Sequence, residues 1–261
     1  MNRTAGNLSV GKMQPMNAVE TCPICGGSGW KITEREGISG AEKCQCADAG
    51  RTERIEERAG IPPLYRNASL DNFTNLSRPA LVRAMSDVRH YIRHFPSLPE
   101  PGLLFLGPPG TGKTHLAVAA LRGLIANGFQ GIFFDFQSLL MRIHKGYDKA
   151  SGSSDREAFQ SALDAEILLL DDLGASRIND WVEDTVTSIM THRCNSRKAT
   201  IVTSNLRDQD AGDQRGSGLQ EDLHSKYFLD ERIGVRARSR LFEMCKLIQM
   251  RDVEDYRLKK R

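Results

Sequence analysis

The eight residues GPPGTGKT, at positions 107–114, decide the fold of this 261-residue chain. They match the pattern G-x-x-x-x-G-K-S/T at every fixed position. The apolar run LLFL precedes them. The helix-compatible run KTHLAVAALRGLIANG begins with their last two residues and continues beyond them. In such a loop, glycines let successive backbone N–H groups point at phosphate oxygens, and the helix adds its positive N-terminal end. The stretch therefore predicts a nucleotide-phosphate loop between a strand and a helix.

Two side chains of this loop have expected chemical roles. Lys113 would reach the β- and γ-phosphates of ATP, and the hydroxyl of Thr114 would bind Mg²⁺. A glycine-rich turn that matches by chance is the alternative. The expected ATP-binding residues of the loop and of the start of its helix are Pro109, Gly110, Thr111, Gly112, Lys113, Thr114 and His115.

A second stretch, ILLLDDLG at positions 167–174, sets four apolar residues directly against two aspartates. Carboxylates rarely leave water and two side by side repel each other, so a cation or a proton transfer has to compensate for their burial. In a phosphate-loop protein this strand is expected beside the loop strand, which would bring Asp171 to the Mg²⁺ on Thr114. Asp172 would then orient or deprotonate the attacking water. An acidic strand end in open solvent is the alternative.

Around these motifs, expected strands and helices alternate from residue 79 onward. This alternation implies an α/β fold with a parallel sheet covered by helices on both faces. No apolar run is long enough to span a bilayer, and the polar start MNRTAGNLSV is no secretory signal. We therefore expect a cytoplasmic protein without membrane association.

Four of the six cysteines lie near the N-terminus, where CPIC and CQC form a C-x₂-C and a C-x-C pair. Two close pairs can form a tetrahedral thiolate site, and a segment of about twenty-five residues has too little core to fold alone. Structural Zn²⁺ is therefore expected on Cys22, Cys25, Cys44 and Cys46. Free thiols, a redox pair and an iron–sulfur cluster are the alternatives.

These features divide the chain into four parts. We expect a flexible tail at residues 1–20, a zinc-binding module at 21–60, a linker at 61–78 and an ATPase domain at 79–261. The net charge is only +3, but basic residues gather in the last thirty positions. Such clustering suits phosphate or nucleic-acid partners, and a solvated helix face equally well.

Three further runs bear on hydrolysis and on DNA. TIVTSN ends a strand with Asn205, whose amide could sense the γ-phosphate, although an asparagine there is usually a turn residue. In the arginine series that follows, an arginine could neutralise transition-state charge at a neighbouring subunit. QSLLMRIHKGY mixes cations with an aromatic, as single-strand binders do, or is an ordinary amphipathic helix. The candidates for DNA contact are Arg142, Lys145 and Tyr147.

Taken together, GPPGTGKTHLA, LLLDDLG, TIVTSN, RARSRL and DYR at these separations resemble the AAA+ ATPases of the bacterial helicase-loader family, of DnaC/DnaI type, and the similar IstB-type transposition helpers. The resemblance covers about residues 60–257. It implies a parallel sheet of five strands in the order 5-1-4-3-2, without a full C-terminal helical lid.

The same resemblance implies roles for several side chains. Asn205 looks like the sensor asparagine and Arg257 like the second sensor arginine. Arg240 looks like an arginine finger that acts on a neighbouring subunit, and Arg236 like a nearby accessory arginine. The chain departs from the family pattern in a polar insertion at residues 208–218, because of which Arg238 competes with Arg240 for the finger role.

Three functions are open at this point. The first is an ATP-switched loader that grips a hexameric replicative DNA helicase with its zinc module, binds single-stranded DNA and self-assembles through ATP-bridged interfaces. The second is an IstB-type ATPase that assembles on DNA and assists a transposase. The third is a metal-dependent DNA-binding module with a vestigial ATPase, against which the intact Lys113, Thr114, Asp171 and Asp172 argue. The expected zinc module favours the loader, since some DnaI-type loaders have a similar domain.

Overall fold

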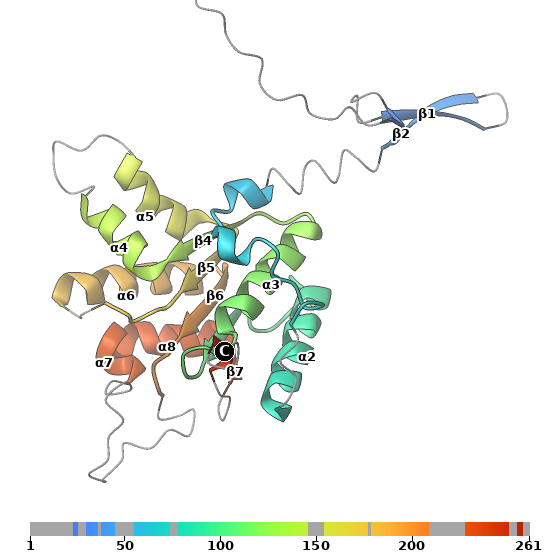
Figure 1. Cartoon of the computed structure of the whole chain (residues 1–261). Coiled ribbons are helices and arrows are strands. Elements are labelled where there is room, and N and C mark those ends of the chain that lie inside the picture. Colours follow the sequence, from blue (N-terminus) through green and yellow to red (C-terminus); the bar gives the residue numbers. More distant parts are fainter. Residues whose placement is uncertain are drawn as a thin grey trace, which may run out of the picture. The chain divides into compact units, whose positions relative to one another are not determined.

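The computed structural model describes residues 23–25, 30–35, 38–44, 55–73, 78–145, 154–176, 179–208, 228–250 and 255–257 (Figure 1). The chain forms two compact units, Met1–Arg51 and Thr52–Arg261. None of the helices in the described ranges combines the length and the apolar character needed to cross a bilayer.

The larger unit is built on a parallel sheet. Within the described residues, five strands lie in the order β4-β5-β6-β3-β7, and every neighbouring pair is parallel. With the strands numbered in chain order from the loop strand β3, the order read from β7 is 5-1-4-3-2, so the predicted fold is confirmed. The strand that ends at Asp171, β5, does not lie beside β3 as predicted, because β6 pairs with both and lies between them. The strands are β3 (Gly102–Leu106), β4 (Gly131–Asp135), β5 (Ile167–Asp171), β6 (Ala199–Ser204) and β7 (Cys245–Gln249).

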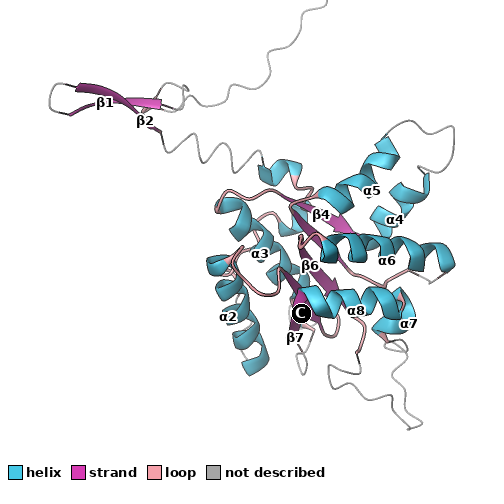
Figure 2. Ribbon diagram, turned by 180° about the vertical axis from the view of Figure 1, so that it is seen from behind, coloured by secondary structure: helices cyan, strands magenta, loops and turns pink. Residues whose placement is uncertain are grey.

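Helices cover both faces of this sheet, as Figure 2 shows. One face packs against α2 (Pro79–His94) and α3 (Lys113–Ala126). The other face packs against α4 (Phe136–Lys145), α5 (Ser154–Asp164), α6 (Asp180–Asn195), α7 (Leu229–Ile233) and α8 (Val235–Met244). Side chains of a strand alternate between the faces, so Leu103 and Phe105 join the first core while Leu104 and Leu106 join the second.

A buried arginine ties the second layer to the amino ends of the strands. Arg193 of α6 is fully buried and donates to the carbonyl oxygens of Ala162 and Ala165 at 3.0 and 2.9 Å. It also donates to the hydroxyl of Thr200 at 2.9 Å. Burial lowers the pKa of Arg193 to about 10, which is still well above neutral pH, so the guanidinium stays charged. The oxygens that accept its hydrogen bonds take the place of water around this charge.

An irregular segment, residues 55–73, completes the first core, and we call it the strap. It is helical at residues 55–58 and forms one 3₁₀ turn, η1 (Pro63–Tyr65). Its Ala59, Ile61 and Phe73 are buried with α2 and α3. The sequence assigned most of this stretch to a linker, because it shows no periodicity, whereas here the larger unit begins already at Thr52.

The smaller unit contains an antiparallel hairpin of β1 (Trp30–Arg35) and β2 (Ile38–Lys43), in which Trp30 pairs with Lys43. Cys44 follows β2 and is buried, and Cys25 lies in the described residues 23–25. The other two predicted zinc ligands, Cys22 and Cys46, lie outside the described residues. Among the residues that are described, no group of three or more potential ligands could hold a metal ion. The zinc site therefore stays a prediction.

Candidate nucleotide site

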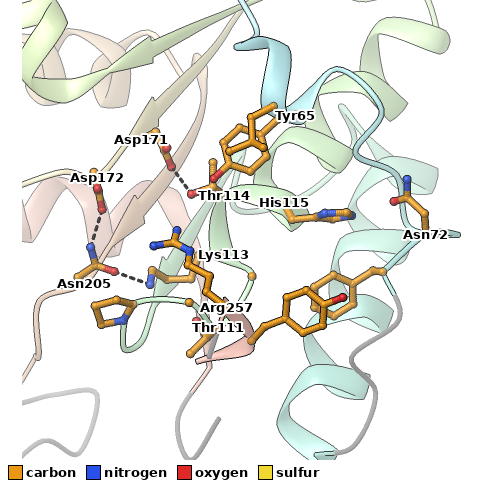
Figure 3. A pocket seen from close by; sticks show the side chains of 16 residues that line it. Tyr65, Asn72, Thr111, Lys113, Thr114, His115, Asp171, Asp172, Asn205 and Arg257 are labelled. Atoms are coloured by element: carbon orange, nitrogen blue, oxygen red, sulfur yellow. Dashed lines mark hydrogen bonds between the residues drawn. The ribbon is translucent and has the colours of Figure 1, made fainter. Parts of the chain in front are cut away.

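A cavity of about 570 Å³ opens at the carboxyl ends of β3, β5 and β6 (Figure 3). In parallel α/β sheets this edge is where ligands bind, and the volume suits a nucleotide. Besides the loop residues 109–114, its walls are formed by the start of α3, the tips of β5 and β6, the strap and the C-terminal segment. These walls contain Leu64, Tyr65, Asn72, Phe73, His115, Asp171, Asp172, Asn205, Tyr256 and Arg257.

The phosphate loop needs its glycines for conformation and for space. Gly110 and Gly112 have φ angles of 72° and 96°, in the left-handed region that side chains disfavour. A Cβ on Gly112 would also lie 2.6 Å from the ring of Phe73 in the strap. Because α3 begins at Lys113, the loop's N–H groups gather at a helix N-terminus, where anions are bound favourably.

Lys113 is the buried cation of the site. Its ammonium donates to the carbonyl oxygens of Gly107 and Pro108 at 2.8 and 2.7 Å and to Oδ1 of Asn205 at 2.6 Å. Burial lowers its pKa to about 8, although the nearby Asp172 and Asp171 raise it again in part. The side chain is only 5% exposed, so its charge is held by these oxygens.

Thr114 and Asp171, the two residues predicted to hold Mg²⁺, contact each other in the cavity wall. The Thr114 hydroxyl donates to Oδ1 of Asp171 at 2.9 Å. Burial raises the pKa of Asp171, while hydrogen bonds from Thr203 and Thr114 act in the opposite direction. A hydroxyl and a carboxylate at this separation are hard oxygen donors of the kind that Mg²⁺ prefers, so these residues fit the predicted ion.

Asn205 connects Lys113 to Asp172. Its Nδ2 donates to Oδ1 of Asp172 at 2.6 Å, while its Oδ1 accepts from Lys113. An ammonium can only donate and a carboxylate can only accept, so the two neighbours determine the orientation of the amide. Asp172 itself has a left-handed backbone, with φ of 57°. The strand tips of β5 and β6 thus bring both predicted residues to the phosphate loop.

The C-terminal segment lies on the phosphate loop. The N–H of Tyr256 donates to the carbonyl oxygen of Gly110 at 3.0 Å. A Cβ on Gly110 would meet Oδ1 of Asp255 at 1.8 Å, so this glycine also makes room for the segment. The contact places Arg257 in the wall of the cavity, as Figure 3 shows.

The arginines of α8 lie elsewhere. Arg236 is exposed, and Arg240 donates to Glu243 of the same helix at 2.6 Å. Neither lines the cavity of its own chain. Arg238 makes a bidentate ion pair, 2.6 and 2.7 Å, with Asp208, which is 1% exposed. A bidentate pair with a buried carboxylate holds Arg238 in the fold of its own chain.

The residues predicted to contact DNA are only partly described. Arg142 on α4 is exposed, and its guanidinium lies 5.5 Å from the ring centre of Phe134. Lys145 ends α4, and Tyr147 lies outside the described residues. The opposite side of α4 buries Leu139, Leu140 and Ile143.

Sequence reasoning missed the contribution of the strap and of one threonine. Tyr65, Asn72 and Phe73 line the cavity, and the carbonyl oxygen of Ser69 lies 2.9 Å from Nε2 of His115. No motif marks these residues, because an irregular segment has no period to detect. Thr203 donates to Asp171 at 2.6 Å, and its place two residues before Asn205 was the one available signal.

Fold and site together define a P-loop ATPase of the AAA+ class. Residues 99–261 match the family model of the IstB-like ATP binding protein, which is well over half of the chain. The chain therefore belongs to the IstB-like ATP-binding protein family. ATP binding and ATPase activity follow from this membership together with the phosphate loop, and the predicted enzyme class is confirmed.

Helicase loaders are among the proteins similar to this chain. The replicative helicase loader DnaC of Escherichia coli (strain K12) is 26% identical over 162 residues, which are 61% of this chain and 65% of that protein. The chain thus spans just under two thirds of the relative's length. A crystal structure of the DnaC helicase loader is 33% identical, with a TM-score of 0.59, and the match covers 74% of this chain and 100% of that one.

The AMPPCP-bound DnaA of Aquifex aeolicus is similar in fold. It has a TM-score of 0.53 at 22% identity, and the match covers 73% of this chain and 51% of that one.

Proposed function

We propose that this chain is an ATP-dependent replication factor that binds a replicative DNA helicase and loads it onto single-stranded DNA, with ATP hydrolysis as the release switch. The observation that carries the proposal is the hydrogen-bonded connection from Lys113 through Asn205 to Asp172. These hydrogen bonds join the phosphate loop, which follows β3, to Asn205 at the tip of β6 and Asp172 at the tip of β5. A γ-phosphate bound to Lys113 would therefore alter contacts at the ends of all three strands. The similarity to DnaC loaders supports the choice of partner.

Within the site, each side chain has one proposed task. Lys113 binds the β- and γ-phosphates, and Thr114 and Asp171 hold Mg²⁺, which when bound neutralises phosphate charge. Asp172 orients the attacking water or accepts its proton, with Asn205 holding the carboxylate in place. Arg257 acts on the nucleotide of its own chain, which its place in the cavity wall supports.

Arg240 is proposed to act on the nucleotide of a neighbouring copy, with Arg236 as its accessory. Two observations support this choice. Both side chains lie outside the cavity of their own chain, and Arg238, the competing residue, is engaged with the buried Asp208. Self-assembly through ATP-bridged interfaces would then be required for hydrolysis.

The N-terminal unit is proposed to carry one Zn²⁺ on its four cysteines and to grip the helicase. Its hairpin presents Trp30 and Ile32, which are 52% and 81% exposed, and such apolar side chains suit a protein partner. Single-stranded DNA is proposed to contact Arg142, Lys145 and Tyr147, and the exposure of Arg142 supports this.

A pull-down of the purified chain with the host's replicative helicase tests the proposal. We expect capture of the hexameric helicase, and a difference in capture between ATP and no nucleotide. Lys113→Ala is the matched control, since it should keep the N-terminal unit intact and lose the nucleotide effect. Absence of capture in every nucleotide state would overturn the loader function.

A transposition helper is the second candidate, because the family model that matches this chain is the IstB-like one. Such a protein would assemble on double-stranded DNA and recruit a transposase. A transposase gene beside the gene for this chain, together with capture of that transposase in place of the helicase, would favour this function.

A further inference from the structure

Two consecutive residues of β6, Thr203 and Ser204, hold the turn that follows β5. The hydroxyl of Thr203 donates to Oδ1 of Asp171 at 2.6 Å, and it accepts from the backbone N–H of Asp172 at 3.0 Å. The carbonyl oxygen of Thr203 accepts from the N–H of Leu173 at 2.8 Å. Ser204 donates its hydroxyl to the carbonyl oxygen of Leu173 at 2.7 Å. Both aspartates of the site are therefore held through the hydroxyl of one threonine.

The position of Thr203 gives this hydroxyl a defined direction. Thr203 is fully buried in β6, the central strand of the sheet, and it pairs with Phe105 of the neighbouring strand β3. A hydroxyl has one hydrogen to donate. The carboxylate of Asp171 needs that hydrogen, while the N–H of Asp172 needs a lone pair. The hydroxyl therefore acts as a donor to Asp171 and as an acceptor from Asp172, so a side chain without a hydroxyl would lose both hydrogen bonds.

The second contact supports an unfavourable backbone conformation. Asp172 has φ of 57°, and residues other than glycine seldom adopt this region. By accepting from the N–H of Asp172, Thr203 helps to keep the backbone there, and the carboxylate then reaches Asn205. Thr203 thus contacts Asp172 through the backbone N–H of that residue and Asp171 through its carboxylate.

We propose that Thr203 is a positioning residue that sets Asp171 for the magnesium ion and Asp172 for the attacking water, although it touches neither ligand. The proposal rests on the assignment of Asp171 to Mg²⁺ in the proposed function. Thr114 is itself expected at the ion, whereas Thr203 lies behind Asp171 and can hold the carboxylate throughout. Outer-shell donors of this kind orient metal ligands.

The test is the magnesium dependence of nucleotide binding, which needs no turnover. A fluorescent ATP analogue is titrated into the full chain at a series of Mg²⁺ concentrations and in EDTA. For Thr203→Val, we expect the Mg²⁺ concentration for half-maximal binding to rise about tenfold, as for loss of an outer-shell contact. Binding in EDTA should stay at the parent value, because Lys113 and the loop are unchanged.

Two matched variants separate positioning from general loss of stability. Thr203→Ser keeps the hydroxyl and should restore the parent's magnesium dependence. Thr200→Val removes another fully buried hydroxyl of β6, which bonds Arg193 and Lys198 at the far end of the strand. It should lower the midpoint of thermal unfolding without changing the magnesium dependence. If Thr203→Val does not fold, Thr203→Ala takes its place.

Three outcomes would overturn the proposal. The first is a parent-like magnesium dependence in Thr203→Val. The second is an equal shift in Thr200→Val, and the third is no recovery in Thr203→Ser. A parent chain whose nucleotide binding ignores Mg²⁺ would instead overturn the assignment of Asp171 in the proposed function, and the proposal for Thr203 with it.

Discussion

At the scale of single residues, the ammonium of Lys113 is a cation buried in the nucleotide site. Burial lowers its pKa from 10.5 to about 8, and the two aspartates only partly oppose this. The folded state therefore binds this proton less tightly than the unfolded state does. Below about pH 8 both states carry the proton, and burial of the charge costs stability. Between about pH 8 and 10.5 only the unfolded state still carries it, so stability rises with pH there.

This sign leads to a prediction for Lys113→Met, which removes the charge. We compare the free energy of unfolding of the nucleotide-free parent with that of this variant. The difference, parent minus variant, should rise with pH between about 8 and 10.5, by at most about 1.4 kcal/mol per pH unit. Urea unfolding of both proteins at several pH values measures the difference. Lys246→Met is the control, since Lys246 is 42% exposed and pairs with Asp87. A parent-to-variant difference that stays level across this range would contradict the prediction.

Asp172→Asn should separate binding from hydrolysis. Asparagine tolerates a left-handed backbone and can still accept from Asn205, so the local structure should persist. It cannot accept a proton from water, and we expect the hydrolysis rate to fall at least about 100-fold. A fluorescent-nucleotide titration should give the parent's affinity, while a phosphate-release assay reports the loss. Hydrolysis at the parent's rate would exclude Asp172 as the base.

At the scale of elements, the strap and α3 act as one body. Arg122 near the end of α3 pairs with Glu56 at 3.0 Å and donates to the carbonyl oxygen of Ala68 at 2.8 Å. At the start of α3, Phe73 of the strap lies against Gly112, and its ring is 5.3 Å from that of His115. The helix that begins at the phosphate loop is thus bound to the strap at both of its ends.

Arg122→Met should loosen the strap and weaken nucleotide binding. Methionine retains much of the apolar stem but loses both polar anchors, whose net loss costs about 1–3 kcal/mol. We expect faster hydrogen exchange in residues 59–73 and a nucleotide affinity reduced about three- to tenfold. Arg89→Met, at an exposed arginine of α2, is the matched control. Loss of stability with an unchanged affinity would mean that the strap does not shape the cavity.

At the scale of the whole molecule, the proposed arrangement divides each active site between two copies. Arg240→Ala keeps the cavity and loses the finger, whereas Lys113→Ala keeps the finger and loses nucleotide binding. We expect each variant alone to lack ATPase activity and a mixture on single-stranded DNA to recover part of it. Absence of recovery at every mixing ratio would mean that Arg240 acts within its own chain or only on the fold.

The N-terminal unit should contain one Zn²⁺ per chain, because four thiolates complete a tetrahedral site without outside ligands. Elemental analysis of freshly purified protein measures the zinc content, which should be lost in a Cys22→Ser/Cys44→Ser variant. Cys194→Ser is the control, since Cys194 lies on α6 in the other unit. Zinc-free parent protein, or zinc retained in the double variant, would refute the site.

The sequence by itself determined the fold class and the centre of the nucleotide site, whereas the strand order followed only from the resemblance to the helicase-loader family. Motif residues such as Lys113 and Asp171 could be recognised because their chemistry is concentrated in short runs next to strongly apolar strands.

Only the tertiary structure decided which other residues join that centre. Tyr65 and Phe73 of the strap and Thr203 of β6 reach the site from segments far apart in the chain. The ion pair between Asp208 and Arg238 also joins residues thirty positions apart. Arg240, two residues further on, instead pairs with Glu243 of its own helix. Contacts between distant residues arise when the sheet assembles and its strand tips meet at one edge. No local period or spacing records them, because their partners become neighbours only in the folded chain.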